Sequence, residues 1–138
     1  MNDTFLVTDT HPLVWYLSKQ DKKLPKRVLA AFLSAEEGSG THIWVPAAVA
    51  WEFSQLSRKT DRIKLTVPFE ELIRENFHFK NLTIAELQPD DQIIANGLSF
   101  NRDPFDALIV ATALRLELPL ITADGEITDS KTCEIFWK

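Results

Sequence analysis

Short apolar runs alternate along this chain with longer segments whose apolar residues recur at helical spacing, and this alternation constrains the fold more than any other feature. The runs predict strands at residues 5–7, 43–45, 82–84, 120–122 and 134–136. The longer segments predict helices at 10–17, around 28–33 after Pro25, and at 46–58, 68–77, 90–98 and 104–118. Strands and helices that alternate in this way indicate an α/β fold with a mainly parallel sheet.

Length and composition indicate one globular unit. The chain has 138 residues, which suits one domain, and we expect that domain to span residues 1–138. Hydrophobic residues make up 45% and charged residues 25%, which excludes a disordered or low-complexity chain. The sequence has no apolar run of membrane-spanning length, no recognisable signal peptide and a single cysteine, Cys133. We therefore expect a cytoplasmic protein that does not contact a membrane.

Two acidic residues stand at the ends of predicted strands. Asp9 follows the first strand and Asp124 follows the strand at 120–122. In a parallel α/β fold the carboxyl ends of strands and the N-termini of helices share one edge of the sheet, where ligands usually bind. Each acid also has an ordinary structural interpretation, Asp9 as a helix N-cap and Asp124 as a turn residue before Gly125. Neither acid identifies a site by itself.

Glu52 lies on the apolar face of its predicted helix. It comes three residues after Val49 and four before Leu56, positions that share one side of a helix. An ionised carboxylate on that side is costly unless it is paired or bound to a cation. The alternative is a glutamate at the helix edge that reaches water or pairs with Arg58 or Lys59.

The helix at 104–118 begins with two acids for which we expect different roles. Asp103 as N-cap and Pro104 at the first helical position satisfy ordinary capping rules. Asp106 comes three residues before Ile109 and four before Val110, so it shares their buried side. We expect Asp103 to cap the helix and Asp106 to be the functional acid.

Four acids can therefore converge on one edge of the sheet: Asp9, Glu52, Asp106 and Asp124. Converging carboxylates repel one another, so a divalent cation is their natural partner. Ligands that are all oxygen favour Mg²⁺ or Mn²⁺ over Zn²⁺. The sequence predicts an acidic, metal-binding site.

Four segments resemble motifs of the PIN-domain family, namely residues 7–11 (VTDTH), 51–53 (WEF), 102–113 (RDPFDALIVATA) and 120–124 (LITAD). The resemblance covers nearly the whole chain and is closest to the VapC-type toxins of prokaryotic toxin–antitoxin systems. Asp9, Glu52 and Asp106 match the three best-defined acids of the family pattern, and Asp124 matches its more variable fourth. Ala123 departs from the pattern, because many relatives have Arg or Lys there.

The resemblance implies a fold, an activity and partners. The fold is a three-layer α/β/α arrangement with a mainly parallel central sheet between helices. The activity is that of a ribonuclease that depends on Mg²⁺ or Mn²⁺ and acts as a toxin. The implied partners are an RNA substrate, a second copy of the chain in a homodimer, and a cognate antitoxin that blocks the site.

Phosphodiester hydrolysis requires a nucleophilic water and a stabilised pentavalent phosphorus, and one or two metal ions can supply both. The catalytic and metal-binding cluster would consist of Asp9, Glu52, Asp106 and Asp124. The hydroxyl of Thr10 or Thr122 would orient a carboxylate or a bound water beside it.

The net charge of −5, from 15 Lys and Arg against 20 Asp and Glu, argues against a protein that coats nucleic acid through bulk positive charge. A nuclease needs only a few local cations. One basic cluster contains Lys19, Lys22, Lys23, Lys26 and Arg27. A second cluster follows the helix of Glu52, and we favour it for RNA binding: Arg58, Lys59, Arg62 and Lys64.

The aromatic and histidine residues have no assigned role in this scheme. We expect the four tryptophans to be core or interface residues: Trp15, Trp44, Trp51 and Trp137. We expect His11 and His78 to be loop or packing residues.

Two other functions remain open at this point. One is a PIN-like binding or scaffold module that has lost catalysis, although its acids are intact. The other is a phosphatase or phosphotransferase with Asp9 as nucleophile. Enzymes similar to haloacid dehalogenases have a second acid two residues after the first, and here His11 occupies that position.

Overall fold

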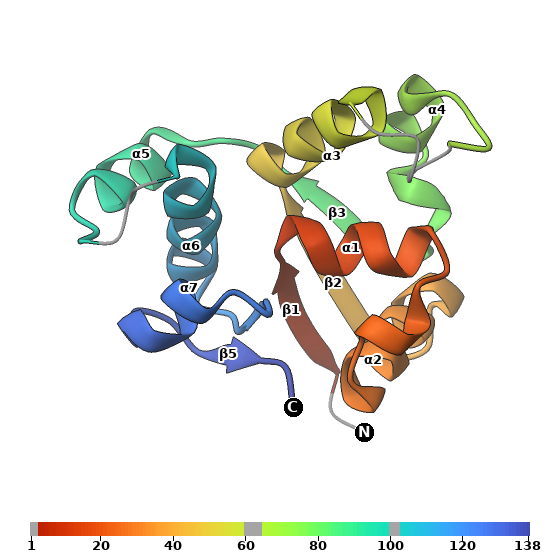
Figure 1. Cartoon of the computed structure of the whole chain (residues 1–138), viewed down its shortest axis with the longest axis horizontal. Coiled ribbons are helices and arrows are strands. Elements are labelled where there is room, and N and C mark those ends of the chain that lie inside the picture. The colour runs from red at the N-terminus through yellow and green to blue at the C-terminus, as the bar shows by residue number, and fades with distance from the viewer. Residues whose placement is uncertain (1–2, 60–64, 100–102) are drawn as a thin grey trace.

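The computed structural model describes residues 3–59, 65–99 and 103–138. Within these residues one parallel sheet contains β1 (Thr4–Thr8), β2 (Thr41–Pro46), β3 (Leu82–Ala85), β4 (Leu120–Ile121) and β5 (Ile135–Phe136). The strand order is β3-β2-β1-β4-β5. Helices lie on both sides of the sheet, which confirms the predicted three-layer α/β/α architecture (Figure 1).

The first set of helices connects β1, β2 and β3. It comprises α1 (Thr10–Leu17), α2 (Lys26–Glu37), α3 (Ala47–Lys59) and α4 (Phe69–Arg74), with the 3₁₀ turns η1 (Asp21–Lys23) and η2 (Asn76–His78). The second set connects β3, β4 and β5 and comprises α5 (Pro89–Asn96), α6 (Pro104–Leu116) and α7 (Gly125–Ser130). Parallel crossovers are right-handed, and the two sets step in opposite directions along the sheet, so they cover opposite faces. Figure 1 shows α1, α2 and α4 to one side of the sheet and α5, α6 and α7 to the other.

The carboxyl ends of β1 and β4 form the point at which the strand order reverses. Strand β1 pairs with β2 on one side and with β4 on the other, with Thr8 opposite Ile121. The amide of Asp9 donates to the carbonyl of Ile121 over 2.9 Å, which holds the two strand ends together. Ligands of open α/β sheets bind in the crevice at such a switch point. The topology therefore brings the segments after β1 and β4 to one place.

The core explains why the strands are short apolar runs. Both faces of the sheet are covered by helices, so inward and outward side chains alike are buried. Val7 of β1, Ile43 and Val45 of β2, and Leu120 and Ile121 of β4 are all 0% exposed. This apolar centre sets the positions of the strand ends, and with them the acids that follow.

Several predicted boundaries differ from the structure by a few residues, and two of these differences have a clear physical cause. Pro46 was expected to open a helix, but it is the last residue of β2 and lies opposite Ala85 of β3, so α3 begins at Ala47. The helix predicted at 68–77 ends at Arg74, because the backbone then takes left-handed φ values of 51° to 65° over Asn76–His78. That reversal places the buried ring of Phe77 against Phe53, with ring centroids 5.4 Å apart.

Helix α7 was not predicted. Asp124 and Gly125 were expected to form a turn, whereas Asp124 caps α7 by accepting a hydrogen bond from the amide of Ile127 over 2.8 Å. The helix has six residues and a single buried apolar side chain, Ile127. A segment this short carries no helical periodicity that could be recognised in the sequence.

A buried ion pair joins the two helices that form the outer part of the second layer. Nε of Arg115 on α6 lies 2.5 Å from Oδ1 of Asp91 on α5, and the Asp91 side chain is completely buried. The other carboxylate oxygen accepts a hydrogen bond from the amide of Gln88 over 2.9 Å, which closes the N-terminus of α5. The pair therefore fixes α5 against α6.

Replacing Arg115 by Met is expected to lower the free energy of unfolding by about 3–5 kcal/mol, because it leaves a buried carboxylate unpaired. Urea unfolding measures the effect. The matched control is Arg74→Met, which removes an exposed pair with Glu70 whose side chains are 74% and 77% exposed. The control should change stability by less than about 0.5 kcal/mol. Equal effects of the two substitutions would contradict the structural role of the buried pair.

None of the helices in the three described ranges has both the length and the apolar character needed to cross a membrane.

Candidate active site

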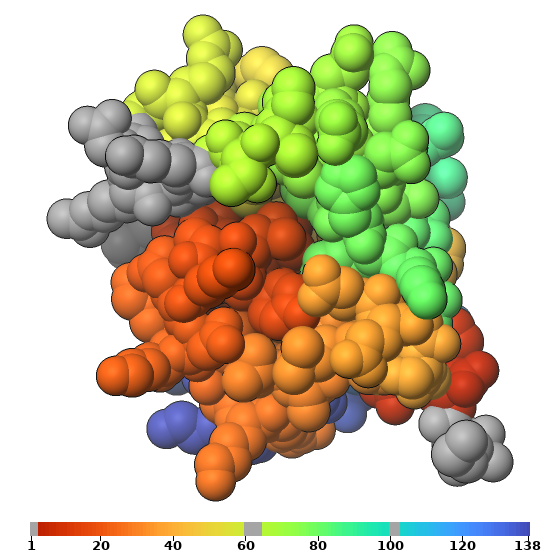
Figure 2. Space-filling model, turned by 90° about the vertical axis from the view of Figure 1, so that its right-hand side faces the viewer, coloured from red at the N-terminus to blue at the C-terminus, as the bar shows by residue number. Residues whose placement is uncertain are grey.

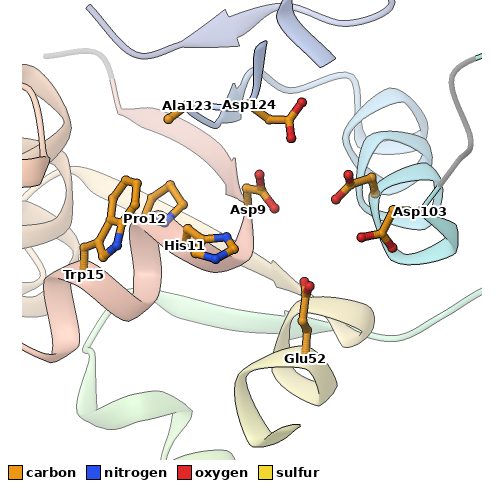
Figure 3. A pocket seen from close by; sticks show the side chains of 9 residues that line it. Asp9, His11, Pro12, Trp15, Glu52, Asp103, Ala123 and Asp124 are labelled. Atoms are coloured by element: carbon orange, nitrogen blue, oxygen red, sulfur yellow. The ribbon is translucent and has the colours of Figure 1, made fainter. Parts of the chain in front are cut away.

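A pocket of about 310 Å³ opens at the carboxyl ends of β1 and β4. Five carboxyl side chains line it, and they come from four separate segments of the chain: Asp9, Glu52, Asp103, Asp106 and Asp124. Figure 3 labels four of them, Asp9, Glu52, Asp103 and Asp124, arranged around a common space. The rest of the lining consists of His11, Pro12, Trp15 and Ala123. The described lining thus contains neither Lys nor Arg.

Asp9 is held by hydrogen bonds to both of its carboxylate oxygens. It is the N-cap of α1, and its Oδ1 accepts from the amide of Thr10 over 2.7 Å. Its Oδ2 accepts from the hydroxyl of Thr122 over 2.7 Å. The residue is 7% exposed, so the carboxylate stands at the floor of the pocket in one fixed orientation. Asp9 therefore caps α1 and lines the pocket at the same time.

Glu52 reaches the pocket from the second turn of α3. It is half-buried, in the helix whose neighbouring residue Phe53 is completely buried. Its Oε1 accepts a short hydrogen bond from the hydroxyl of Thr10. Thr10 therefore links α1 to α3 and directs the Glu52 carboxyl group toward Asp9 (Figure 3). No pair with Arg58 or Lys59, the alternative considered for this residue, is present among the described residues.

Asp103 and Asp106 occupy the two positions at the start of α6 that the sequence predicted. Asp103 caps α6, and its Oδ1 accepts from the amide of Phe105 over 2.9 Å. Asp106 lies in the first turn of α6 and is half-buried. Both side chains line the pocket, so Asp103 contributes negative charge there in addition to its capping bond.

Asp124 follows β4 and is tied to Asp9 through Thr122. The amide of Asp124 donates to the hydroxyl oxygen of Thr122 over 3.0 Å, and that hydroxyl donates to Asp9. Thr122 is 0% exposed, so no water competes for these bonds. Because the second oxygen of Asp124 is not used in capping α7, it can serve the pocket. The catalytic roles of these residues stay predictions, whereas their common location is observed.

The pocket favours the neutral forms of Asp9, Glu52 and Asp106. Burial, and after it the charges of Asp9, Asp103, Asp124 and Glu52, raises the pKa of Asp106 from 3.8 to about 7. Burial also raises the pKa of Asp9 and of Glu52, although the hydrogen bonds from Thr122 and Thr10 act in the opposite direction. Carboxylates that raise one another's pKa in this way form a site of excess negative charge.

Without divalent cations, the stability of the protein is expected to fall as the pH rises from about 4 to about 7. Asp106 loses its proton near its ordinary pKa of 3.8 in the unfolded chain but only near 7 in the folded protein. Between these values the folded state binds more protons, so each increase in pH favours unfolding. Solvent screening of this half-exposed group limits its contribution to about 1–2 kcal/mol.

Urea unfolding at several pH values in the presence of a chelator measures this slope. Asp106→Asn should reduce it, whereas Asp129→Asn, which alters an exposed acid of α7 outside the pocket lining, should not. A slope that Asp106→Asn leaves unchanged would contradict the electrostatic description of the pocket.

The donor set of the pocket suits a hard divalent cation. Carboxylate oxygens are the ligands that Mg²⁺ and Mn²⁺ prefer. Over the described ranges, no group of three or more His, Cys, Asp or Glu side chains is placed so that it could hold a metal ion. Mg²⁺ generally keeps several waters and binds through one or two carboxylates, so a complete protein cage is not required. The charge and chemistry of the pocket therefore fit the predicted type of ion.

His11 and Trp15 line the pocket, which the sequence did not predict. His11 was expected to be a loop or packing residue and Trp15 a core or interface residue. Trp15 does pack against the core, but its side chain also forms the pocket wall. The spacing of His11 and Trp15 could have indicated this location, because residues four apart lie on the same side of a helix and this helix starts directly after Asp9.

The described residues of the favoured basic cluster, Arg58 and Lys59, are not part of the pocket. Arg58 and Lys59 are exposed at the end of α3 and do not line it. Arg62 and Lys64 lie outside the described residues, as does Arg102 of the quoted motif. From the other cluster, Nζ of Lys23 lies 5.5 Å from the ring centroid of Trp15. The structure thus links the first cluster, through Trp15, to the pocket.

Comparisons with known proteins agree with this architecture. The family model described as PIN domain matches residues 6–130. Among solved structures, the chain is similar to a chain in the crystal structure of VapBC2 from Rickettsia felis bound to a DNA fragment from their promoter, with a TM-score of 0.69 and 14% identity. This similarity covers 98% of the present chain and 100% of the other, and at such low identity it shows the fold alone. No curated protein matched the sequence.

Proposed function

Because this chain belongs to the PIN domain family, we propose that it is a ribonuclease that depends on Mg²⁺ or Mn²⁺ and acts as the toxin of a toxin–antitoxin pair. One observation carries the proposal, namely that carboxyl groups from four segments converge in one pocket at the switch point of the sheet. Such a concentration of buried acids opposes folding, since burial and, after it, the neighbouring carboxylates raise the pKa of Asp106 to about 7. A binding cation, rather than packing, accounts for it best.

Asp9 and Asp106 would hold the metal ion, and Glu52 and Asp124 would complete the cluster. When bound, the ion would supply an activated water and stabilise the negative charge that develops on the phosphoryl oxygens. The hydrogen bonds from Thr10 and Thr122 keep the carboxylate of Asp9 from rotating.

Glu52 has one carboxylate oxygen that Thr10 does not occupy. The hydroxyl of Thr10 donates to Oε1, which leaves Oε2 available to accept a proton from the attacking water. Burial raises the pKa of Glu52, and a raised pKa makes its carboxylate a stronger base. In this scheme Glu52 adds negative charge to the metal-binding cluster and also accepts the proton of the attacking water.

The proposal includes protein partners and a cellular location. We propose that the chain forms a homodimer, that a cognate antitoxin protein blocks the acidic pocket, and that the protein acts on RNA in the cytoplasm. The similarity of fold to a chain of the VapBC2 complex supports an antitoxin partner.

Incubation of the purified protein with labelled single-stranded RNA tests the activity. We expect cleavage with Mg²⁺ or Mn²⁺ and none with a chelator. A DNA strand of the same sequence tests whether cleavage requires the ribose of RNA. Equal cleavage with and without the chelator would refute a metal-dependent site. Metal binding in calorimetry without any cleavage would instead favour a PIN-like binding module that has lost catalysis.

A further inference from the structure

The side of the pocket formed by α1 is aromatic. In Figure 3, His11 and Trp15 lie on one side of Asp9, and Asp103 of α6 lies on the other. The ring centroids of His11 and Trp15 are 5.9 Å apart. Those of Trp15 and Trp137 are 6.3 Å apart. A row of rings therefore leads from the acids to the C-terminal segment after β5.

Cations stand beside this row. Nζ of Lys23 lies 5.5 Å from the Trp15 ring centroid, and Cζ of Arg27 lies 3.9 Å from that of Phe136. Arg27 also donates to the carbonyl oxygen of Lys138 over 2.9 Å, which joins the start of α2 to the C-terminus. Figure 2 shows this face, where orange side chains of the segment between α1 and α2 project near the blue C-terminal residues. We call Trp15, Trp137, Lys23 and Arg27 the aromatic–basic strip.

The cations of this region are available to a polyanion. Five basic residues between the end of α1 and the start of α2 are exposed, and none forms an ion pair with an Asp or Glu side chain of the described residues: Lys19, Lys22, Lys23, Lys26 and Arg27. The chain has a net charge of −5, so a local group of five cations without acidic side-chain partners stands out against its overall charge. It adjoins the acidic pocket through Trp15.

The two tryptophans are not used solely for packing. The large side chains at the centre of the core, such as Phe32 and Phe53, are 0% exposed. Trp15 and Trp137 are only partly buried at the edge of that core. Trp15 also borders open space in the pocket. Exposed indole surface beside free cations is the combination that binds unpaired bases, because bases stack on aromatic rings while phosphates contact Lys and Arg.

The pocket itself cannot supply the affinity for a nucleic acid. Its carboxylates repel phosphates, and its described lining includes no Lys or Arg. A metal ion offsets this repulsion only at the phosphate that it contacts. The remaining binding energy must come from groups next to the pocket, and among the residues that the structure describes the aromatic–basic strip is an adjoining surface that has them.

We propose that the aromatic–basic strip binds the single-stranded RNA that flanks the bond to be cut, with bases stacked on Trp15 and Trp137 and phosphates beside Lys23 and Arg27. The inference rests on the proposed ribonuclease function and identifies the surface that binds its substrate. Stacking requires unpaired bases, so the strip selects single strands over duplexes. Protein ligands are an alternative that the experiment distinguishes.

Binding is measured by the fluorescence anisotropy of a labelled single-stranded RNA oligonucleotide at low salt in the presence of a chelator, so that no cleavage is needed. Trp15→Ala should weaken binding roughly tenfold, and Trp15→Phe, which keeps an aromatic face, should retain most of it. Lys23→Gln should weaken binding and reduce the dependence of log Kd on log salt by about one unit. The wild-type protein should also show quenching of tryptophan fluorescence on binding.

The matched controls come from α3, outside the strip. Trp51→Ala alters a tryptophan that is 50% exposed on α3, and Lys59→Gln alters a cation of the second basic cluster. Neither residue lies on the strip, so both variants should bind RNA like the wild type. Trp15→Phe and Lys23→Gln keep the test decisive if Trp15→Ala does not fold.

The outcomes separate this proposal from the proposed function. Cleavage by the wild type together with unchanged RNA binding by Trp15→Ala and Lys23→Gln would overturn the strip and leave the ribonuclease intact. RNA binding that these variants weaken, in a protein that never cleaves, would support the strip and overturn the ribonuclease. Tighter binding of a duplex than of the single strand, or strip variants that lose only a protein partner, would also overturn the strip.

Discussion

Asp106→Asn is expected to reduce the rate of metal-dependent RNA cleavage by about 1000-fold or more while the protein remains folded. The substitution keeps the size of the side chain but removes a charge that the metal site requires, and the loss of one group that stabilises transition-state charge has effects of this order. Folding should not suffer, because four other carboxyl groups already oppose the charge on Asp106. Single-turnover cleavage of labelled RNA, with circular dichroism to verify the fold, measures the effect.

Asp103→Asn is the matched control on the same turn of α6. Asn is as good an N-cap as Asp, so the bond to the amide of Phe105 can persist. Activity should remain within about tenfold of the wild type, since only one peripheral charge is lost. A complete loss of activity in Asp103→Asn, with Asp106→Asn still active, would show that the functional acid of the pair had been assigned to the wrong residue.

Expression of the wild-type chain in bacteria without an antitoxin is expected to arrest growth, and Glu52→Gln is expected to abolish that arrest. The amide oxygen of Gln can still accept the hydrogen bond from Thr10, so the link between α1 and α3 is retained. The variant loses the negative charge and the capacity to accept a proton, and an amide oxygen is a weaker ligand for a hard cation. Colony formation after induction measures the result, with the amount of soluble protein verified on a gel.

The control for this experiment is Glu70→Gln, which changes an exposed acid of α4 remote from the pocket lining. It should arrest growth like the wild type. Equal arrest by Glu52→Gln would remove Glu52 from the mechanism. Absence of arrest in all three proteins would contradict the toxin role, while cleavage of RNA by the purified wild type would still stand as a separate result.

The α/β class and the location of the acids were predictable because both depend on local patterns. Short apolar runs indicated buried parallel strands, and parallel strands place their carboxyl ends at one edge whatever their order. Asp9 and the segment of Asp124 therefore had to lie at that edge. The distinction between Asp103 and Asp106 was likewise local, since capping and helix spacing depend on neighbours within one turn.

Partners between distant segments were decided only by the tertiary structure. The strand order β3-β2-β1-β4-β5 places β4 beside β1, and this pairing is what brings the hydroxyl of Thr122 to Asp9 across 113 residues of sequence. Helix α7 and the approach of Lys23 to Trp15 also depend on contacts that no periodicity encodes. The hydrophobic periodicity of a segment shows which of its faces is buried. Which other segment packs against that face depends on how all the buried faces fit together in one core.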